Sequence, residues 1–363
     1  MSDVLIIGGG VIGLLSAREL SLAGAEVTLL DRQAPARESS WAGGGIISPL
    51  YPWRYADSVT RLASWSQAAY PDLVDALHAD TGIDAQFEPT GLLLYAPGEE
   101  DAALHWARTH GRTIERLDQA EVAALEPAWA TPKADTLWMP EVGHVRNPRL
   151  AKALIADLQR RGVRLLADHE VTGCQHQGRR VTQVLTNRGT LPADRVLLSA
   201  GAWTPGLLTA LPTAPEIHPV RGQMLLFRGS PGTVRRMVLE ESRYIIPRRD
   251  GRILFGSTLE ETGFAKDTTA EAFEELRGLA VARFPVLAGL AVEHHWAGLR
   301  PASPGGVPYI AQHPDADNLF VCAGHFRNGV VLGPASARLA CDLILQRPPL
   351  LAPDDYHFHT ARG

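Results

Sequence analysis

The first thirty residues show blocks of apolar and polar positions that predict a strand, a helix and a second strand. A short apolar run from Val4 to Ile7 leads into a cluster of glycines, and a segment of helical periodicity follows from about Val11 to Ala23. Gly24 ends this helix, and the sequence EVTLL forms the next strand. A strand, a helix and a strand in this order predict a βαβ unit with parallel strands.

The same two periodicities recur between residues 147 and 345. The pattern predicts a helix over residues 147–162. Strands are expected at residues 163–166, 170–175, 179–187 and 195–203. Near the C-terminus, a strand at 318–324, a turn and a helix at 330–345 form another βα unit. We expect this unit to join the N-terminal one, so that one sheet is built from segments far apart in the chain.

The segment RYIIPRRDGRILFG, residues 243–256, predicts a β-hairpin. An Asp-Gly pair at Asp250–Gly251 between two apolar runs is the strongest short-range signal for a two-residue turn. Such a turn would pair Arg249 with Arg252, and Tyr244 with Ser257. Because like charges in direct opposition are tolerated only in water, we expect these two arginines, and most of the arginines of the segment, to be solvated.

The first strand of this hairpin also carries a proline and a tyrosine. Pro247 cannot donate a hydrogen bond to the ladder, which predicts a position near a sheet edge or a bulge. By the period of two, Tyr244 and Ile246 share a face, and Leu259 lies diagonal to Tyr244 on that face. Taken alone, the pattern is typical of a core tyrosine whose hydroxyl finds a local partner.

Composition and charge narrow the class of protein. The chain has 363 residues, of which 45% are apolar, and a formal net charge of −5, which suits two or three domains with packed cores. This balance gives no general attraction to nucleic acid or to anionic lipid. The apolar start is rich in glycine, is too short for a membrane span and lacks the flanks of a signal peptide. We therefore expect a cytoplasmic protein that binds neither nucleic acid nor membrane.

The cysteines give no sign of a metal site. Cys174, Cys322 and Cys341 lie far apart, and no pair has the spacing of metal ligands. Three scattered cysteines suit a reducing compartment with buried thiols. No metal is expected.

The glycines after the first strand predict a dinucleotide-binding turn. Gly8, Gly10 and Gly13 form a G-x-G-x-x-G pattern, which allows a tight turn, a close approach to a pyrophosphate and close packing of helix on strand. The helix that follows directs free N–H groups and its positive dipole end toward the phosphates. Asp31 ends the second strand, where a carboxylate accepts hydrogen bonds from ribose hydroxyls and repels a 2′-phosphate. A glycine-rich turn without a nucleotide is the alternative interpretation.

A second glycine-rich segment favours FAD over NAD. Residues 38–48 read ESSWAGGGIIS, in which Ser39 and Ser40 offer hydroxyls to phosphate or ribitol oxygens. Gly43, Gly44 and Gly45 let the backbone lie flat against a planar ring. An isoalloxazine with a phosphate tail needs such a second approach, whereas an ordinary surface loop would be less apolar than this one.

These segments carry a resemblance to a known family. RESSWAGGGIISPLYPWRY (37–55) resembles the D-amino-acid oxidase-like FAD-dependent amine oxidoreductases, and within them the glycine-oxidising branch associated with thiazole synthesis for thiamine. The other matching motifs are VRNPRL, LSAGAW, RGQM, YIIPRRDGR, HWAGLRP and GHFRNGVVLGP. Together they cover essentially the whole chain.

The resemblance implies an α/β fold with two domains. A doubly wound, Rossmann-like FAD-binding domain is expected to be discontinuous, with residues 1–85, 146–215 and 305–363. An α+β substrate domain with a large antiparallel sheet is expected from residues 86–145 and 216–304.

The resemblance also implies the site residues. Tyr244 and Arg300 would hold the substrate carboxylate with Arg327 nearby, and Ile46, Ser48 and Leu259 would line the substrate pocket. Ile46 and Leu259 stand where the family has methionines, and Ser242 stands where one branch has a histidine, which leaves the substrate preference open. The expected cofactor contacts are Gly8, Gly10, Val11, Ile12, Gly13, Asp31, Arg32, Ser39, Ser40, Gly44, Gly45, Ile46, Val171, His325, Phe326, Arg327, Asn328, Gly329, Val330 and Val331.

The implied reaction is the oxidative deamination of glycine, with weaker activity on sarcosine and D-alanine. The products would be an imine that hydrolyses to an α-keto acid and ammonia, and hydrogen peroxide from dioxygen. FAD is expected to be non-covalent, because the segment PASPGGVPYI lacks the linking cysteine of sarcosine-oxidase-like relatives. No general base is assigned, because none is required if the amine arrives unprotonated. A strand would point His294 and His295 to opposite faces, so both are expected to be structural or to lie behind the site.

Several alternatives stay open at this point. A D-amino-acid dehydrogenase would pass electrons to a carrier, and a tRNA-modifying module would act on an amine of a macromolecule. Arg300 could instead pair with an acid and tie two domains together. The sequence does not decide the preferred amine, the rate or the oligomeric state, and a homo-oligomer is compatible with it. It also does not decide between a role in thiamine synthesis and one in catabolism.

Overall fold

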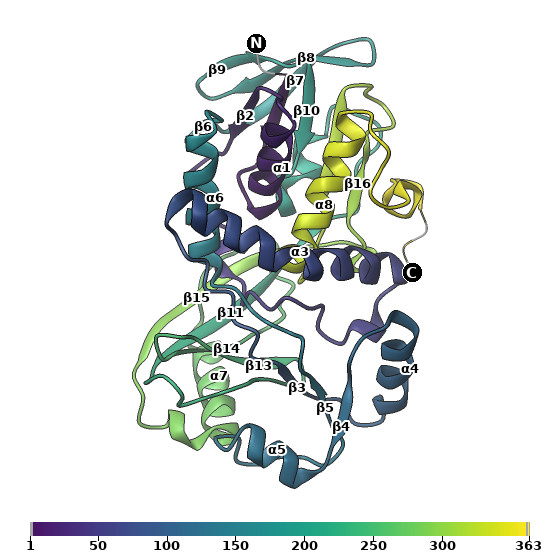
Figure 1. Ribbon diagram of the computed structural model, residues 1–363. Helices are drawn as coiled ribbons and strands as arrows, with labels where there is room; N and C mark the ends of the chain where they lie inside the picture. The colour runs from purple at the N-terminus through teal and green to yellow at the C-terminus, as the bar shows by residue number, and fades with distance from the viewer. Residues whose placement is uncertain (1–2, 361, 363) are drawn as a thin grey trace.

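The computed structural model describes residues 3–360 and 362, and its strands form sheets of six, eight and three strands (Figure 1). The six-stranded sheet has the order β16-β17-β10-β1-β2-β6. All its pairings are parallel except that of β16 with β17. Its strands are β1 (Val4–Ile7), β2 (Val27–Leu30), β6 (Arg164–Leu166), β10 (Arg195–Leu198), β16 (Tyr309–Gln312) and β17 (Leu319–Ala323).

The two faces of this sheet are covered by different elements. Val4 and Ile6 point into a core with four helices, while Leu5 and Ile7 point into a core with a three-stranded sheet. This alternation follows from the period of two along a strand that is buried on both faces. The helices are α1 (Val11–Leu22), α3 (Asp57–Thr81), α6 (Asn147–Arg160) and α8 (Gly329–Ile344), and the small sheet contains β7 (Val171–Gln177), β8 (Arg180–Thr186) and β9 (Gly189–Pro192).

The eight-stranded sheet lies below the parallel sheet in Figure 1 and has the order β15-β11-β14-β13-β12-β3-β5-β4. Its pairings are antiparallel except that of β12 with β3. The strands are β3 (Leu92–Tyr95), β4 (Glu115–Leu117), β5 (Thr136–Met139), β11 (His218–Arg228), β12 (Met237–Glu240), β13 (Arg243–Pro247), β14 (Arg252–Gly256) and β15 (Val292–Ala302). Near this sheet lie α4 (Glu100–His110), α5 (Gln119–Leu125) and α7 (Ala270–Arg283), and α7 packs against β11 and β14.

A largely parallel sheet, covered by helices on one face and by the small sheet on the other, together with a second, largely antiparallel sheet confirms the predicted α/β fold class. The first helix and its two strands lie where the apolar pattern placed them, and β17 with α8 joins the N-terminal sheet as expected. Both sheets take strands from several separate stretches of the chain, and the expected domain boundaries stay a prediction. Among residues 3–360 and 362, no helix combines the length and the apolar character needed to cross a membrane.

The hairpin of β13 and β14 forms, but its predicted register is wrong by one residue. Tyr244 pairs with Gly256, and the backbone of Arg248 pairs with that of Arg252. A three-residue loop closes the hairpin, and only Gly251 in it has a positive φ, of 84°. A two-residue type I′ turn would have required positive φ at Asp250 as well. The longer loop with one left-handed glycine avoids that strain.

Two further predictions for this segment are corrected. Pro247 does not lie on an edge strand, because β13 is inside the sheet; it lies at the end of β13, beyond the residues that pair with β12. The arginines are not a uniformly solvated group. The Arg249 side chain is 52% exposed and pairs with Asp84 and Glu88, whereas Arg248 is buried.

Candidate active site

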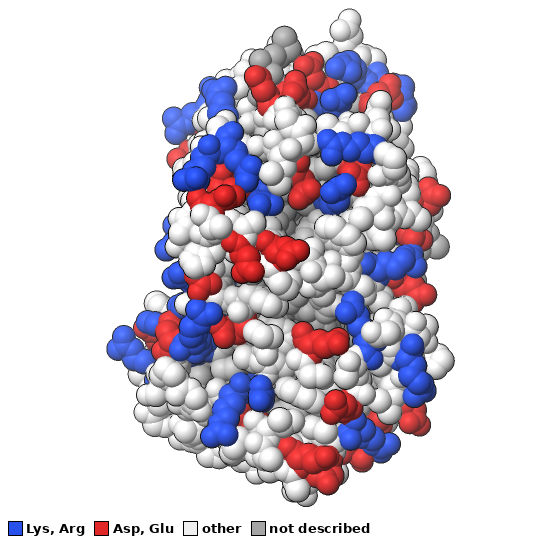
Figure 2. Space-filling view, in the orientation of Figure 1, with Lys and Arg blue, Asp and Glu red and all other residues white. Residues whose placement is uncertain are grey.

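An elongated cavity lies between the parallel sheet and the eight-stranded sheet. Its empty space, including the part open to solvent, is about 1740 Å³. Its wall takes residues from β1, the start of α1, the segment with Gly43–Gly45, and the strands β11, β13 and β15, so the space runs from the turn after β1 to the eight-stranded sheet. On the face shown in Figure 2, acidic and basic side chains are interspersed, so this face presents no field of a single sign.

The dinucleotide end of the cavity begins at the turn between β1 and α1. A Cβ built on Gly13 would lie 1.9 Å from the carbonyl oxygen of Gly8, so only glycine allows the helix this close to the strand. Asp31 accepts a hydrogen bond of 2.8 Å from the N–H of Gly9. The hydroxyl oxygen of Ser40 accepts one of 2.8 Å from Val11. The turn is therefore held in one shape by side chains from two later segments.

The carboxyl of Asp31 sits in an unusual environment for an aspartate. Burial raises its pKa, and the N–H groups of Gln33 and Gly9 counteract part of that rise. Its two oxygens accept from these N–H groups at 3.0 and 2.8 Å. Each carboxylate oxygen has a second lone pair, so Asp31 retains the capacity to accept from a ribose hydroxyl.

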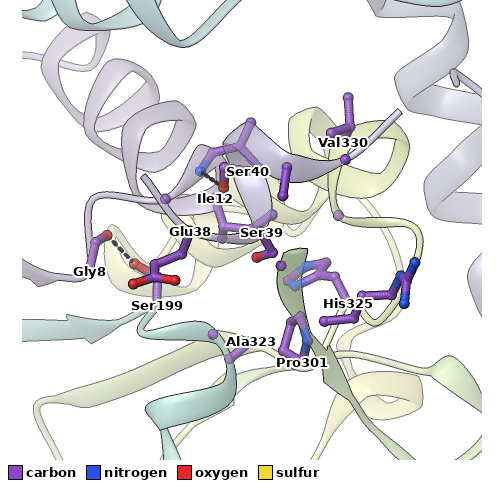
Figure 3. Close-up of a pocket in the computed structure, with 18 of the residues that line it drawn as sticks. Gly8, Ile12, Glu38, Ser39, Ser40, Ser199, Pro301, Ala323, His325 and Val330 are labelled. Carbon is purple, nitrogen blue, oxygen red and sulfur yellow. Dashed lines mark hydrogen bonds between the residues drawn. The ribbon is translucent and has the colours of Figure 1, made fainter. Parts of the chain in front are cut away.

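Segments far apart in the chain meet around the middle of the cavity. Figure 3 shows Glu38, Ser39 and Ser40 on one side, with His325 and Val330 of the C-terminal unit across the same space. The hydroxyl of Ser199 donates to the carbonyl of Gly8, which fastens the end of β10 to the glycine turn.

The turn before α8 brings buried polar atoms without protein partners to this region. Among the described residues, His325 Nε2, Arg327 Nη2 and Asn328 Nδ2 are buried and have no hydrogen-bond partner. Burial lowers the pKa of His325 to about 3, so its imidazole is neutral at physiological pH. Buried polar atoms ordinarily have partners, and those of His325 and Arg327, which line the cavity, indicate a bound group there.

The other end of the cavity is formed by side chains on the eight-stranded sheet. Tyr244 lies on β13 and is 7% exposed, with its hydroxyl 3.5 Å from Met224 Sδ. The guanidinium of Arg300, on β15, donates to Ser257 Oγ at 2.6 Å and to the carbonyl oxygens of Arg221 and Thr258. Burial lowers the pKa of Arg300, and no carboxylate among the described residues pairs with it.

The position of Arg300 depends on a glycine in the neighbouring strand. A Cβ on Gly222 would lie within 2.3 Å of three guanidinium atoms of Arg300. The RGQM motif therefore opens the space in which the guanidinium lies over β11. The alternative in which Arg300 ties domains together through an acid finds no such acid among residues 3–360 and 362.

Most of the expected site residues line this one cavity, and four do not. Gly13 is packed against Gly8, and Val331 belongs to the core of the parallel sheet. Asn328 is buried beside the cavity but is not part of its wall. Leu259 is 44% exposed and lies outside the wall, so the expectation that it forms part of the pocket ceiling is corrected. Residues 259–269 form a surface loop, which turns Leu259 toward solvent.

Several residues of the wall were not found from the sequence. Trp203 and Glu38 are two of them: the guanidinium of Arg32, an expected contact, stacks on Trp203 at 3.9 Å and pairs with Glu38 at 2.6 Å. Met224 and Ser257 line the substrate end. The RGQM and LSAGAW motifs contain Met224 and Trp203, so the family motifs were a usable signal for these two. Within the described residues, no group of three or more His, Cys, Asp or Glu side chains could hold a metal ion.

Comparison with known proteins agrees with this geometry. The model of the FAD dependent oxidoreductase family (DAO) matches residues 3–343. The chain is 48% identical to a glycine oxidase of Pseudomonas aeruginosa over 97% of both chains. It is 34% identical to the bifunctional protein ThiO/ThiG of Synechocystis, over 95% of this chain and 52% of that protein.

A solved structure shows the same architecture. The crystal structure of glycine oxidase from Geobacillus kaustophilus superimposes with a TM-score of 0.93 and 28% identity, covering 100% of this chain and 99% of that one. The fold, the cavity and the family match thus agree over nearly the whole length. The chain belongs to the DAO family of FAD-dependent oxidoreductases, and FAD is its cofactor.

Proposed function

We propose that this protein catalyses the oxidative deamination of glycine, and more weakly of sarcosine and D-alanine, with dioxygen as electron acceptor. The products would be glyoxylate from glycine, the free amine, and hydrogen peroxide. One observation carries the proposal: the guanidinium of Arg300 faces the cavity beside Tyr244 and pairs with no carboxylate of the described residues. A small carboxylate-bearing substrate would supply that missing partner.

The residues along the cavity fit FAD. The turn from Gly8 to Val11 would hold the pyrophosphate, Asp31 the ribose, and the glycine loop with the turn at His325 would hold the ring. The unpaired buried atoms of His325 and Arg327 are consistent with a polar group held between these segments. FAD, when bound, would accept the two electrons that the amine loses and would pass them to dioxygen.

The chain's own residues would bind and orient the substrate. The guanidinium of Arg300 offers two parallel donors to the carboxylate, and the Tyr244 hydroxyl adds a third. Arg327 brings a second positive charge to the same cavity, and it lowers the pKa of Arg300 further, after burial. A bound carboxylate would relieve the repulsion between the two guanidinium groups.

Arg300 and Tyr244 form a carboxylate clamp, and the apolar wall near it would limit the size of the substrate. Ile46 and Met224 line the cavity together with Tyr244. An apolar wall of this kind would favour a small substrate, and one methyl group more or less is worth only about 1–3 kcal/mol in such a pocket. D-Alanine and sarcosine are therefore expected as weaker substrates rather than excluded ones.

The chain supplies no assigned general base. His325 is buried and neutral with a strongly lowered pKa, so it would accept a proton poorly. His294 is exposed on β15 and lies outside the cavity wall. We infer that the amine binds unprotonated and that water hydrolyses the released imine.

Cytoplasmic location, non-covalent FAD and a role in thiazole synthesis are part of the same proposal. The relative in Synechocystis joins a ThiO half to a ThiG half, which supports the link to thiazole synthesis. Two alternatives are a D-amino-acid dehydrogenase that passes electrons to a carrier and a module that acts on the amine of an RNA.

One set of measurements on the purified protein tests the proposal. Acid precipitation should leave the yellow flavin in the supernatant. Glycine should reduce the flavin under anaerobic conditions and should release peroxide in air, faster than sarcosine or D-alanine does. Reduction by a bulky D-amino acid but not by glycine would contradict the substrate assignment. Flavin reduction by glycine without peroxide release in air would favour the dehydrogenase.

A further inference from the structure

Arg248 is a buried arginine that the function proposed above does not use. It is 7% exposed, and none of the ion pairs among the described residues includes it. Burial lowers the pKa of its guanidinium. A buried charge without a counter-charge is costly unless its donors are satisfied. The contacts that satisfy this one therefore show which parts of the fold it holds.

The guanidinium of Arg248 donates to three acceptors from two other segments. Nη2 donates to the carbonyl oxygen of Gly44 at 2.7 Å. Nη1 donates to the carbonyl oxygen of Val145 at 2.9 Å and lies 2.9 Å from His144 Nδ1. Because a guanidinium has only donors, His144 Nδ1 must be the acceptor. Burial, followed by the charge of Arg248, lowers the pKa of His144, which keeps the imidazole in the neutral form that this contact needs.

Gly44 is touched by two residues on one face of β13 and by Arg248, which directly follows the strand. Tyr244, Ile246 and Arg248 alternate onto one face of the strand. A Cβ on Gly44 would lie 2.7 Å from Ile246 Cδ1 and 3.0 Å from Tyr244 Cε2, and Arg248 binds the carbonyl. The strand that carries Tyr244 and the glycine loop of the cavity wall are thus in direct contact, with Arg248 at the end of that contact.

Arg248 is one of four donors that hold the carbonyls of this loop. The carbonyl of Ala42 accepts from Trp296 Nε1 at 3.0 Å, and that of Gly43 accepts from Asn147 Nδ2 at 3.0 Å. The carbonyl of Gly45 accepts from the N–H of Val145 at 2.9 Å. The C=O and N–H of one peptide point in opposite directions, so a donor on the Gly44 carbonyl fixes the direction of the N–H of Gly45. Glycine needs such fixing more than other residues, because its backbone has the most freedom to lose.

We propose that Arg248 is a positioning residue, which locks the loop of Gly43–Gly45 against the strand of Tyr244 and so sets the spacing between the cofactor's wall and the carboxylate clamp. The part concerning the clamp rests on the proposed function of Tyr244. The part concerning the loop rests only on the contacts of Arg248 and on FAD as the cofactor.

Arg248→Met tests the lock, because methionine fills similar space without donors. The bound flavin should show an altered visible absorption spectrum and faster release of FAD, since the Gly44 peptide is free to rotate. With glycine, kcat should fall about 10- to 100-fold, the size of loss that a misplacement of about 1 Å produces. The Kd of acetate, followed by flavin absorbance, should change less than threefold, because Arg300 is untouched.

Arg249→Met is the matched control. Arg249 is the next residue in the chain, its side chain is 52% exposed, and its ion pairs with Asp84 and Glu88 lie at the surface. Its loss should leave the spectrum, the rate of FAD release and kcat near those of the wild type. An Arg248→Met protein with the same three properties as this control would overturn the proposal, as would a lowered melting temperature with an unchanged flavin spectrum and kcat.

Arg248→Lys covers the case in which the methionine variant does not fold. Lysine keeps the charge but cannot place two nitrogens on Gly44 and on the Val145–His144 pair at once. An intermediate spectrum and a loss of about 3- to 10-fold in kcat are expected. A folded lysine variant with the spectrum and kcat of the wild type would overturn the proposal. The spectrum and FAD release are measured without substrate, so a wild type inactive on glycine would contradict the proposed function and still leave the lock tested.

Discussion

At the dinucleotide end of the cavity, much of the wall comes from three short segments within the first 45 residues, whereas at the substrate end each polar side chain comes from a different strand or turn. The first end is shaped by backbone groups: the turn at Gly8, the start of α1 and the N–H that binds Asp31. The second is shaped by side chains, with Tyr244 on β13, Arg300 on β15 and Arg327 before α8. The contrast teaches that recognition of the cofactor is local in sequence, while recognition of the substrate is a product of the tertiary fold.

The largest expected effect comes from a substitution that impairs only the substrate end of the cavity. Arg300→Leu should cost about 2–5 kcal/mol, or roughly 30- to 5,000-fold in kcat/KM for glycine, because it removes both donors of a desolvated charged pair. Inhibition by acetate and glycolate should disappear. The flavin spectrum should be retained, since no contact of Arg300 reaches the glycine turn.

Two further measurements on the same preparations separate binding from structure. Arg300→Lys should lie between the wild type and the leucine variant, because it keeps the charge but loses the planar fork. The melting temperature should change by only a few degrees, because the loss of the hydrogen bonds to Ser257 and two carbonyls is offset by removal of a buried charge that has no carboxylate partner. A strongly destabilised leucine variant that still binds acetate as tightly as the wild type would contradict the role of Arg300 in binding the carboxylate.

The next largest effect comes from a substitution that impairs only the dinucleotide end of the cavity. Asp31→Ala removes a carboxylate that organises the glycine turn and is expected to bind the ribose. Hydrogen bonds to a charged group contribute about 1.5–3 kcal/mol, so the affinity for FAD should fall roughly 10- to 150-fold. Titration of the apoprotein with FAD measures this, with the exposed Asp317→Ala as control. Once saturated with FAD, the Asp31 variant should turn over normally; full occupancy with lost turnover would refute the role.

The same carboxylate predicts a pH dependence of FAD binding. Burial raises the pKa of Asp31, so protonation begins above the ordinary aspartate value of about 3.9. As the pH falls through the raised pKa, the carboxylate loses its charge and FAD affinity should decrease. In the apoprotein the sign is opposite: a carboxyl with a raised pKa in the folded state adds stability as the pH falls through that pKa. Comparing FAD affinity of the wild type and Asp31→Asn between about pH 4 and 7 tests this, and a constant ratio would contradict it.

A smaller effect measures how much the Tyr244 hydroxyl contributes at the substrate end. Tyr244→Phe removes one neutral donor and should cost about 1 kcal/mol, or roughly fivefold in kcat/KM. Because Tyr244 Oη makes a weak contact with Met224 Sδ and interacts with the Arg300 guanidinium, the loss of stability should stay within about 1 kcal/mol. A loss as large as that of Arg300→Leu would mean that the hydroxyl, and not the guanidinium, dominates recognition.

The smallest effect concerns Leu259, where family likeness and geometry disagree. Leu259→Ala should change KM for glycine by less than about twofold, because the side chain is 44% exposed and does not line the cavity. Steady-state assays with glycine and D-alanine check this. A marked gain in activity on larger amines would restore Leu259 to the pocket and would imply that the loop 259–269 closes when substrate binds.

The sequence predicted those parts of the fold that depend on near neighbours. The βαβ unit follows from periodicity and glycines within thirty residues. The register of the β13–β14 hairpin was missed because the choice between a two- and a three-residue loop depends on the φ of Asp250 rather than on residue type. Arg248 was missed because a run of arginines is typical of a solvated surface. The available signal was that Tyr244, Ile246 and Arg248 alternate onto one face. It indicates a buried Arg248 only when Gly44 is known to pack against that face.

The late position of β17 and α8 has a consequence for synthesis on the ribosome. The glycine turn and β2 emerge first, but β10, the partner on the other side of β1, follows more than 150 residues later, and β17 only near the end of the chain. One edge of β1 stays unpaired until β10 is synthesised, and the wall formed by residues 322–330 is absent until β17 and the start of α8 follow. Nascent chains hold apolar strands unpaired through most of translation, a state that favours aggregation or chaperone binding. A complete wall for the flavin therefore requires that residues 322–330 have been synthesised and have folded onto the N-terminal strands.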